Sequence, residues 1–219
     1  MIRGVLFDFS GTLFRMEPGP SWGEGLTDDQ QERLTQLLTA STLKADHLPP
    51  ELADGWARRD LDPDLHREVY LASLAASGIG LTPEQYEAAY NRVLATESWQ
   101  VYPDTLDTLR RLRAAGVPVA VVSNIPWDIR DIFRAHDAFD LVDEFVLSYV
   151  EGVMKPDPKI FLLACQRIGV TPADALMVGD SAEADGGATA VGITTAIIEP
   201  LPTDRRPGVL LSTLDSHGL

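Results

Sequence analysis

A short apolar run that ends in an acid stands almost at the start of the chain. Val5-Leu6-Phe7 leads into Asp8, and Gly11-Thr12 then breaks the run. An apolar run of this length that ends in turn-forming residues is typical of a buried strand in a parallel sheet. Ligands of open α/β sheets collect outside the carboxyl ends of the strands, which is where we expect Asp8 to lie. The feature therefore predicts an α/β fold with Asp8 at the functional edge of its sheet.

The stretch after this strand carries helical signals up to about residue 99. A loop rich in glycine and proline is expected at residues 17–25, and no strand-like alternation follows it. Capping boxes at residues 27–30 and 82–85 mark the starts of two helices, the second with proline at its first helical position. The pattern predicts an all-helical insert over residues 15–99.

Helices and short apolar strands alternate from Val101 onwards. We expect strands near residues 117–122, 145–147, 176–178 and 193–198, while the tail from Pro200 stays unassigned. Alternation of this kind is typical of βαβ units. The sequence thus predicts a Rossmann-like, doubly wound parallel sheet built from residues 1–14 and 100–219, with the helical insert placed after its first strand.

The charge balance narrows the possible partners. The formal net charge is −15, and Lys44, Lys155 and Lys159 are the only lysines. Such a field repels nucleic acid and anionic membranes, so we expect neither as a partner, and an anionic substrate would need a local positive group. The single cysteine, Cys165, forms no internal disulfide. With no visible secretory leader and no apolar run of membrane-spanning length, we expect a cytoplasmic protein.

Polar side chains follow three of the predicted strands at the point where each strand ends. They are Asp8 with Thr12, Ser123 with Asn124, and Asp180 with Asp185. Each group alone is more often a turn or a solvated surface, but the carboxyl ends of parallel strands meet at one edge of a sheet. Lys155 stands before a predicted helix, and the prolines that follow it restrain the local backbone and suit a side chain that must be aimed. These residues form the candidate site.

The four motifs, in this order, resemble those of the haloacid dehalogenase-like superfamily, whose members are mostly phosphatases. The first motif is similar to residues 8–12, the second to Ser123-Asn124, the third to Lys155-Pro156 and the fourth to residues 179–185. The helical insert resembles the small helical cap of that family. The resemblance covers nearly the whole chain and implies a hydrolase that acts on a small phosphorylated metabolite.

The resemblance implies a role for each motif residue. Asp8 would attack phosphorus and form an aspartyl-phosphate, and Lys155 would supply positive charge beside the transferring oxygens. The hydroxyls of Thr12 and Ser123 and the amide of Asn124 would cradle the phosphoryl oxygens. A Mg²⁺ ion would be held by oxygen ligands, a preference of this hard cation. Those ligands would be Asp8, the main-chain carbonyl of Ser10 and Asp180, with Asp185 either a further ligand or the residue that orients the waters of the ion.

Ser10 departs from the family pattern. The phosphatases normally carry a second aspartate at this position, which protonates the leaving group and later activates water. A serine hydroxyl is far too weak an acid to replace it, and such help is typically worth about 10²–10⁴ in rate. One hypothesis is therefore a phosphatase for substrates with good leaving groups, or one in which His47 or His66 of the cap supplies the acid.

Two other hypotheses stay open. Haloacid dehalogenases also lack the second aspartate but need no metal, so Asp180 and Asp185 argue against dehalogenation. Phosphonoacetaldehyde hydrolases use a cap lysine, for which Lys44 is the candidate in this chain. A non-catalytic phosphate-binding or partner-binding protein is the third. Decay of a site would not be expected to spare all of its polar residues. The sequence thus favours a magnesium-dependent, phosphatase-like hydrolase.

Overall fold

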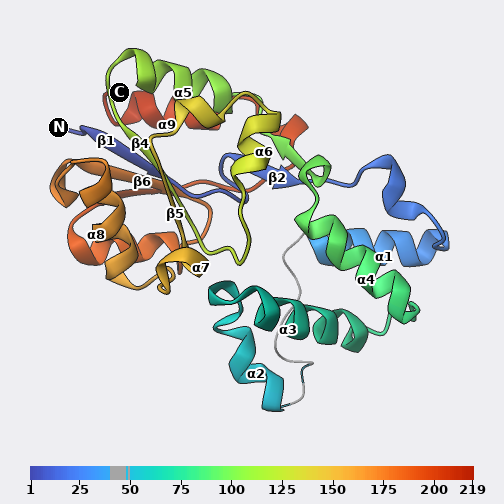
Figure 1. The fold of residues 1–219 in the computed structure, drawn as a ribbon. Helices are drawn as coiled ribbons and strands as arrows, with labels where there is room; N and C mark the ends of the chain where they lie inside the picture. Colours follow the sequence, from blue (N-terminus) through green and yellow to red (C-terminus); the bar gives the residue numbers. More distant parts are fainter. Residues whose placement is uncertain (40–47, 49) are drawn as a thin grey trace.

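The core of the protein is a five-stranded parallel sheet. In the computed structural model, which describes residues 1–39, 48 and 50–219, the strands lie in the order β5-β4-β1-β6-β7. Their bounds are β1 Gly4–Phe7, β4 Val119–Ser123, β5 Glu144–Leu147, β6 Ala175–Gly179 and β7 Thr194–Ile197. Each neighbouring pair is parallel, and β1 lies at the centre between β4 and β6 (Figure 1). This confirms the predicted α/β, Rossmann-like fold.

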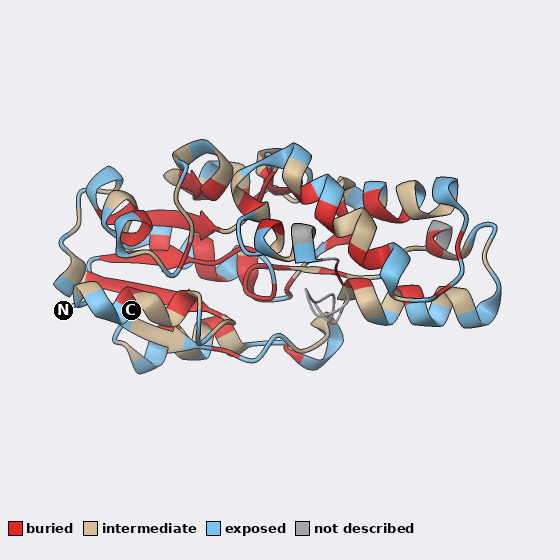
Figure 2. Ribbon diagram, turned by 90° about the horizontal axis from the view of Figure 1, so that it is seen from below, coloured by how far each residue is buried: buried red, intermediate tan, exposed pale blue. Residues whose placement is uncertain are grey.

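Alternate side chains of the strands pack into two separate apolar layers. Phe7 and Val121 face the layer that includes α5 (Thr105–Ala114), α6 (Arg130–Ala135) and α9 (Val209–Ser216). Leu6 and Ala120 face the layer formed with α8 (Pro158–Arg167) and the 3₁₀ segment η7 (Asp185–Val191). Figure 2 shows the strands as the buried centre between these helices. Burial on both faces explains why β1, β4 and β6 read as apolar runs, whereas the edge strand β7 is partly exposed.

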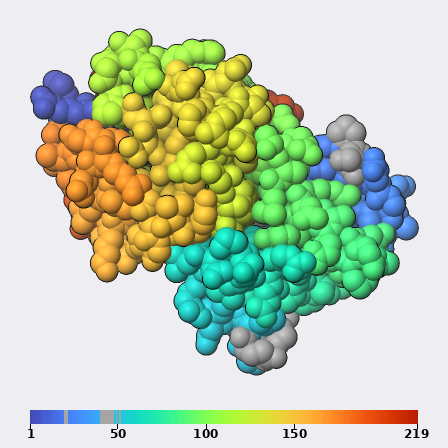
Figure 3. Space-filling view, in the orientation of Figure 1, coloured from blue at the N-terminus to red at the C-terminus, as the bar shows by residue number. Residues whose placement is uncertain are grey.

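Helices dominate the segment that follows the first strand. They are α1 Asp28–Thr39, α2 Pro50–Trp56, α3 Pro63–Ala76 and α4 Pro83–Leu94, with short 3₁₀ turns η1 (Pro20–Gly23), η3 (Arg59–Leu61) and η4 (Thr96–Ser98). The two expected capping boxes are present, because Thr27 pairs reciprocally with Gln30 and Thr82 with Gln85. None of the helices in the described part of the chain is long and apolar enough to span a membrane. The helical insert lies beside the core (Figure 3), and its bounds at residues 15 and 99 stay a prediction.

Two short strands at the crossings between core and insert correct the sequence analysis. β2 (Phe14–Met16) pairs antiparallel with β3 (Trp99–Val101), and no strand was predicted at either place. Three-residue strands are too short to show an alternating pattern, and the partner lies far along the chain. The unassigned tail also contains α9, whose first turn is held by Asp104 through the backbone N–H groups of residues 210 and 211.

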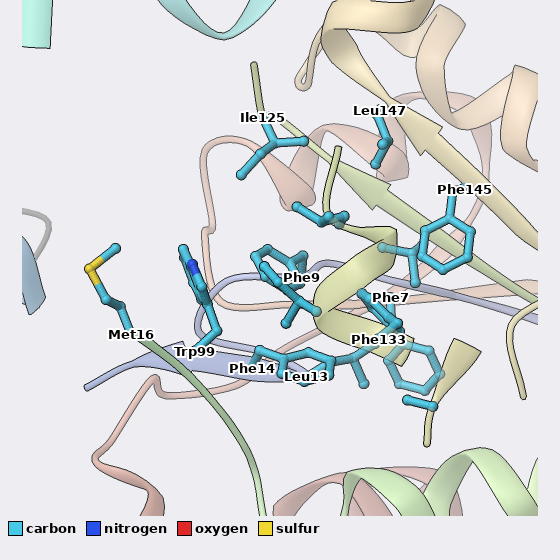
Figure 4. Close-up of a cluster of buried hydrophobic side chains, with 14 of the residues drawn as sticks. Phe7, Phe9, Leu13, Phe14, Met16, Trp99, Ile125, Phe133, Phe145 and Leu147 are labelled. Carbon is cyan, nitrogen blue, oxygen red and sulfur yellow. The ribbon is translucent and has the colours of Figure 1, made fainter. Parts of the chain in front are cut away.

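An aromatic cluster ties these crossings to the sheet. The Phe9 ring lies 4.6 Å from Trp99 and 5.4 Å from Phe14, measured between centroids. Phe133 on α6 continues the cluster, at 4.8 Å from Phe14 and 4.9 Å from Phe145 (Figure 4). Because Phe9 follows Asp8 directly, packing of its ring fixes the backbone that carries the carboxylate.

Truncation of Phe133 to alanine should destabilise the protein strongly. Its side chain is fully buried in the aromatic cluster, so we expect the free energy of unfolding in urea to fall by about 3–5 kcal/mol. Phe139→Ala is the matched control, because that ring is only partly buried at the edge of the same cluster. Equal losses in the two variants would contradict the assignment of Phe133 to the centre of the cluster.

Candidate active site

The sequence-predicted site residues converge at the carboxyl edge of the sheet. Asp8 follows β1 and Asp180 follows β6, and these two strands are direct neighbours. Ser123 ends β4 on the other side of β1, and Asp185 begins η7. Three separated stretches of chain therefore meet at one place, because β4, β1 and β6 are parallel and adjacent.

A buried lysine bridges two of the carboxylates. The Lys155 Nζ atom donates to Oδ1 of Asp8 and to Oδ1 of Asp185, each at 2.6 Å. Burial alone would lower the pKa of Lys155, but the charges of Asp8 and Asp185 outweigh it and raise that pKa above its ordinary value. The ammonium therefore stays charged. It is the local positive group that a chain of net charge −15 requires for an anionic ligand.

Asn124 holds the backbone of this lysine. Its Oδ1 atom accepts from the Lys155 N–H at 2.7 Å, and its Nδ2 atom donates to the Lys155 carbonyl at 2.9 Å. Both ends of the amide group are thus engaged with main chain. The structure gives Asn124 a positioning role that the sequence did not indicate, in addition to the expected place at the edge of the site.

Three carboxylates stand close enough together to share a cation. Oxygen atoms of Asp8, Asp180 and Asp185 lie within 4.8 Å of one another. Burial raises the pKa of Asp8 to about 7 against the opposing charge of Lys155, and the two other carboxylates add to the rise. Burial and the charge of Asp185 raise the pKa of Asp180 to about 6. A bound cation would relieve this repulsion, and an all-oxygen donor set fits Mg²⁺.

The turn after Asp8 leaves no room for a larger residue at Gly11. A Cβ atom there would meet Oδ2 of Asp180 at 2.4 Å, and Gly11 adopts a φ of +77°. Only glycine adopts this conformation without strain and lets the turn approach the carboxylate so closely. The Thr12 hydroxyl on the same turn is buried and has no hydrogen-bond partner in the described part of the chain.

Arg206 supports the turn from the other end of the chain, and no sequence signal singled it out. Its Nη1 atom donates to the Gly11 carbonyl at 2.7 Å, and its Nη2 atom donates to the Thr12 carbonyl. The side chain is fully buried, and its guanidinium lies over the ring of Tyr102. Its position in a proline-rich tail hides its role, because only the fold brings the tail beside the first turn.

A cavity of about 350 Å³ lies between the helical insert and the strand ends. Ser10, Asn124 and Asp180 line it from the core. Its walls include the aromatic residues Trp56, Tyr70 and Trp127 and the charged or polar residues Arg15, Arg59, Asp60 and His66. The acidic site therefore opens into a pocket whose walls are aromatic and also carry two arginines and an aspartate.

The two histidines proposed as cap acids differ in outcome. His47 lies outside the described residues, as does Lys44. His66 does line the cavity, where its Nδ1 atom is hydrogen-bonded to the Tyr90 hydroxyl at 3.0 Å. Burial lowers the pKa of His66 to about 3, and the charge of Arg59 adds to this. The imidazole is therefore neutral at physiological pH, which makes it a poor proton donor.

The parallel core with its helical insert and acidic edge is the architecture of one hydrolase family. The chain belongs to the haloacid dehalogenase-like hydrolases, whose family model matches residues 2–191. A glyceraldehyde 3-phosphate phosphatase from Methanopyrus kandleri is 30% identical over 207 residues, covering 90% of this chain and 84% of that protein. (S)-2-haloacid dehalogenase 4A from Burkholderia cepacia is 34% identical over 202 residues, covering 90% and 83%.

A solved structure shows the same relationship. L-2-haloacid dehalogenase from Xanthobacter autotrophicus aligns with a TM-score of 0.71 at 26% identity, covering 97% of this chain and 83% of that one. The family resemblance carried by the four motifs is thereby confirmed. Since phosphatases and dehalogenases are both among the relatives, the reaction must be argued from the site.

Removal of the buried imidazole should change how stability depends on pH. The unfolded chain takes up a proton at His66 near pH 6.5, whereas the folded chain does so only near pH 3. The contribution of His66 to the free energy of unfolding is therefore fully present above pH 6.5. It is lost as the pH falls below this value, by up to about 1.4 kcal/mol per pH unit. In urea titrations between pH 7.5 and 5, His66→Phe should lose less stability than the wild type. Tyr90→Phe, which keeps the imidazole, should retain the wild-type slope, and identical slopes for all three proteins would contradict a neutral His66.

Removal of the Arg206 donors should weaken the turn that follows Asp8. Arg206→Met keeps much of the side-chain volume but leaves two main-chain carbonyls unsatisfied. We therefore expect the free energy of unfolding to fall by at least about 2 kcal/mol. The neighbouring Arg205 is exposed, and Arg205→Met should leave the free energy of unfolding nearly unchanged. Similar effects of the two substitutions would refute a specific role for Arg206.

Proposed function

We propose that the protein is a magnesium-dependent phosphatase that acts through an aspartyl-phosphate on a small phosphorylated metabolite. The observation that carries the proposal is the cluster of Asp8, Asp180 and Asp185 with Lys155 between two of them. Phosphoryl transfer demands little covalent chemistry from the protein beyond a nucleophile, and relies on charge neutralisation and positioning. The cluster offers a nucleophile and the means of neutralisation together.

Asp8 is the residue that we assign to the attack on phosphorus. Lys155 holds its Oδ1 atom, which orients the carboxylate and leaves Oδ2 as the attacking oxygen. The unpartnered hydroxyl of Thr12 would donate to a phosphoryl oxygen, as would Ser123 at the end of β4. Asn124 acts by holding Lys155 in place, and its side chain borders the cavity.

The donor set fits Mg²⁺. Asp8, Asp180, Asp185 and the main-chain carbonyl of Ser10 would hold the ion, and all of them offer oxygen. Bound Mg²⁺ would supply the charge that allows a phosphate anion to approach three carboxylates. Asp185 is oriented for this by the Ser181 N–H, which donates to its Oδ2 atom at 2.9 Å. Its other oxygen is held by Lys155.

The cavity supports a small substrate with an anionic group. Its volume of about 350 Å³ suits a metabolite, and Arg15 and Arg59 provide positive charge away from Lys155. The relative from Methanopyrus kandleri is named for the hydrolysis of glyceraldehyde 3-phosphate, a small phosphate ester. This relationship favours the same substrate class here.

Dehalogenation of a 2-haloacid is the second candidate. A departing halide needs no proton, which suits Ser10, and the relative from Burkholderia cepacia is a haloacid dehalogenase. A reaction that needs no metal does not explain why a third carboxylate, Asp180, is kept in the buried cluster at an electrostatic cost. We therefore rank phosphatase activity first.

Metal dependence separates these candidates. Purified protein should hydrolyse phosphate compounds only with Mg²⁺, and 2-haloacids should release no halide. Asp180→Asn should raise the Mg²⁺ concentration needed for half-maximal activity at least about tenfold, and Asp8→Asn should abolish turnover. Thermal unfolding gives a second readout, because Mg²⁺ should raise the midpoint of the wild type and much less that of Asp180→Asn.

Glu183→Gln is the matched control for these variants. This acid lies in the same loop as Asp180 but is exposed, so its substitution should leave the Mg²⁺ requirement unchanged. Halide release that persists after removal of metal, together with no phosphate hydrolysis, would overturn the phosphatase assignment and support dehalogenation. Absence of both activities would favour a binding protein.

A further inference from the structure

The site as described lacks a group that can transfer a proton to the leaving oxygen. Ser10 lies exposed in the cavity at the position two residues after the nucleophile, and its hydroxyl is too weak an acid for this task. Lys155 is committed to two carboxylates, and His66 is neutral. A phosphatase for ordinary alcohol esters would need another acid in contact with the cavity.

Asp60 is a carboxyl group placed on the opposite wall of this cavity. It belongs to η3 of the insert, its residue is only 6% exposed, and it lines the same pocket as Ser10 and Asp180. The nearest charged partner is Arg59, whose Nη2 atom lies 3.5 Å from Oδ2 of Asp60. This pair is too long for a strong hydrogen bond, so it does not occupy the carboxyl group fully.

The core fixes the position of this turn. The Ser148 hydroxyl at the start of α7 (Ser148–Glu151) donates to the main-chain carbonyl of Asp60 at 2.5 Å. The same hydroxyl oxygen accepts from the Ile125 N–H at 2.9 Å, next to Asn124. A buried side chain thus links the turn that carries Asp60 to the strand ends that carry the phosphate site. The acid is held over the site by the core itself.

The electrostatic surroundings suit proton transfer near neutral pH. Burial raises the pKa of Asp60 to about 6, while the charges of Arg59 and Lys155 oppose the rise. On α3, which packs against the turn, His66 borders the same cavity as a neutral group. General acids and bases work best with pKa values near the operating pH.

We propose that Asp60 is the general acid and base of the reaction and performs the task for which Ser10 is unsuited. The proposal rests on the proposed phosphatase function and deepens it, because it names the group that would let the site hydrolyse phosphate esters of ordinary alcohols although Ser10 replaces the usual acid. It also makes the helical insert part of the catalytic machinery, since the acid comes from the insert.

The two chemical steps balance with this single carboxyl group. In the first, the oxygen of Asp8 bonds to phosphorus, the bond to the leaving alcohol oxygen breaks, and the proton of Asp60 passes to that oxygen. In the second, a water oxygen bonds to phosphorus and the bond to Asp8 breaks. The Asp60 carboxylate takes the proton of that water, so inorganic phosphate leaves and both acids return to their starting states.

Asp60→Asn tests the proposal with substrates of different leaving groups. For an alkyl phosphate such as glycerol phosphate, we expect kcat/KM to fall by about 10²–10⁴. With p-nitrophenyl phosphate, whose leaving group needs no proton, the variant should release a burst of one nitrophenolate per protein and then turn over slowly. The wild-type rate with alkyl phosphates should decline above about pH 6, and the variant should lack this decline.

Restoration of the acid at its usual place provides the decisive control. The double variant Ser10→Asp/Asp60→Asn should recover alkyl phosphate hydrolysis to within about tenfold of the wild type. A purely structural role of Asp60 would not be rescued by a change at Ser10. Asp64→Asn, an exposed acid close by on α3, should behave as the wild type.

The outcomes separate this proposal from the function on which it rests. If the wild type hydrolyses no phosphate compound with Mg²⁺, the proposed function fails first. If the wild type is active but Asp60→Asn slows alkyl and aryl substrates equally, without a burst and without rescue by Ser10→Asp, the role of Asp60 is overturned and the phosphatase assignment stands. Ser148→Ala, which loosens the turn but keeps the carboxyl group, should slow alkyl phosphates more than p-nitrophenyl phosphate, as Asp60→Asn does but to a smaller extent.

Discussion

The ion pairs of Lys155 are the interaction on which the functional edge of this protein depends. One buried ammonium neutralises part of the charge of Asp8 and Asp185, and removal of either kind of partner would leave an uncompensated buried charge. The two carboxylates follow β1 and β6 of the sheet, and the Asn124 amide holds the Lys155 backbone through two hydrogen bonds. The ion pair with Lys155 thus both orients the Asp8 carboxylate and offsets the cost of its burial.

The turn that follows Asp8 is supported from three directions that are distant in sequence. The Phe9 ring packs among Phe14, Trp99 and Phe133, which join the first turn to the crossings and to α6. Arg206 satisfies two carbonyls of the turn from the C-terminal tail. A rigid first turn matters because a side chain that takes part in a reaction must be positioned before the reaction begins. Apolar packing provides most of this rigidity, and one buried guanidinium completes it.

Much of the fold and of the site could be predicted because the residues involved follow local rules. The apolar runs that end in Asp8, Ser123 and Asp180 have the length of buried strands, and the capping boxes at Thr27 and Thr82 mark helix starts by local hydrogen bonds. The pairing of β2 with β3 and the role of Arg206 have no local signal, because each depends on a partner that lies far along the chain.

The sequence by itself determined the family, the order along the chain of the strands that form the parallel sheet, and the identity of the residues at their ends, since motif residues and apolar periodicity are local properties. Only the tertiary structure decided which of these groups touch. It placed Lys155 between two carboxylates, showed that His66 is neutral, and brought Asp60 into the cavity opposite Ser10. The physical reason is that contact and burial, which set charge states, arise only when distant segments pack together.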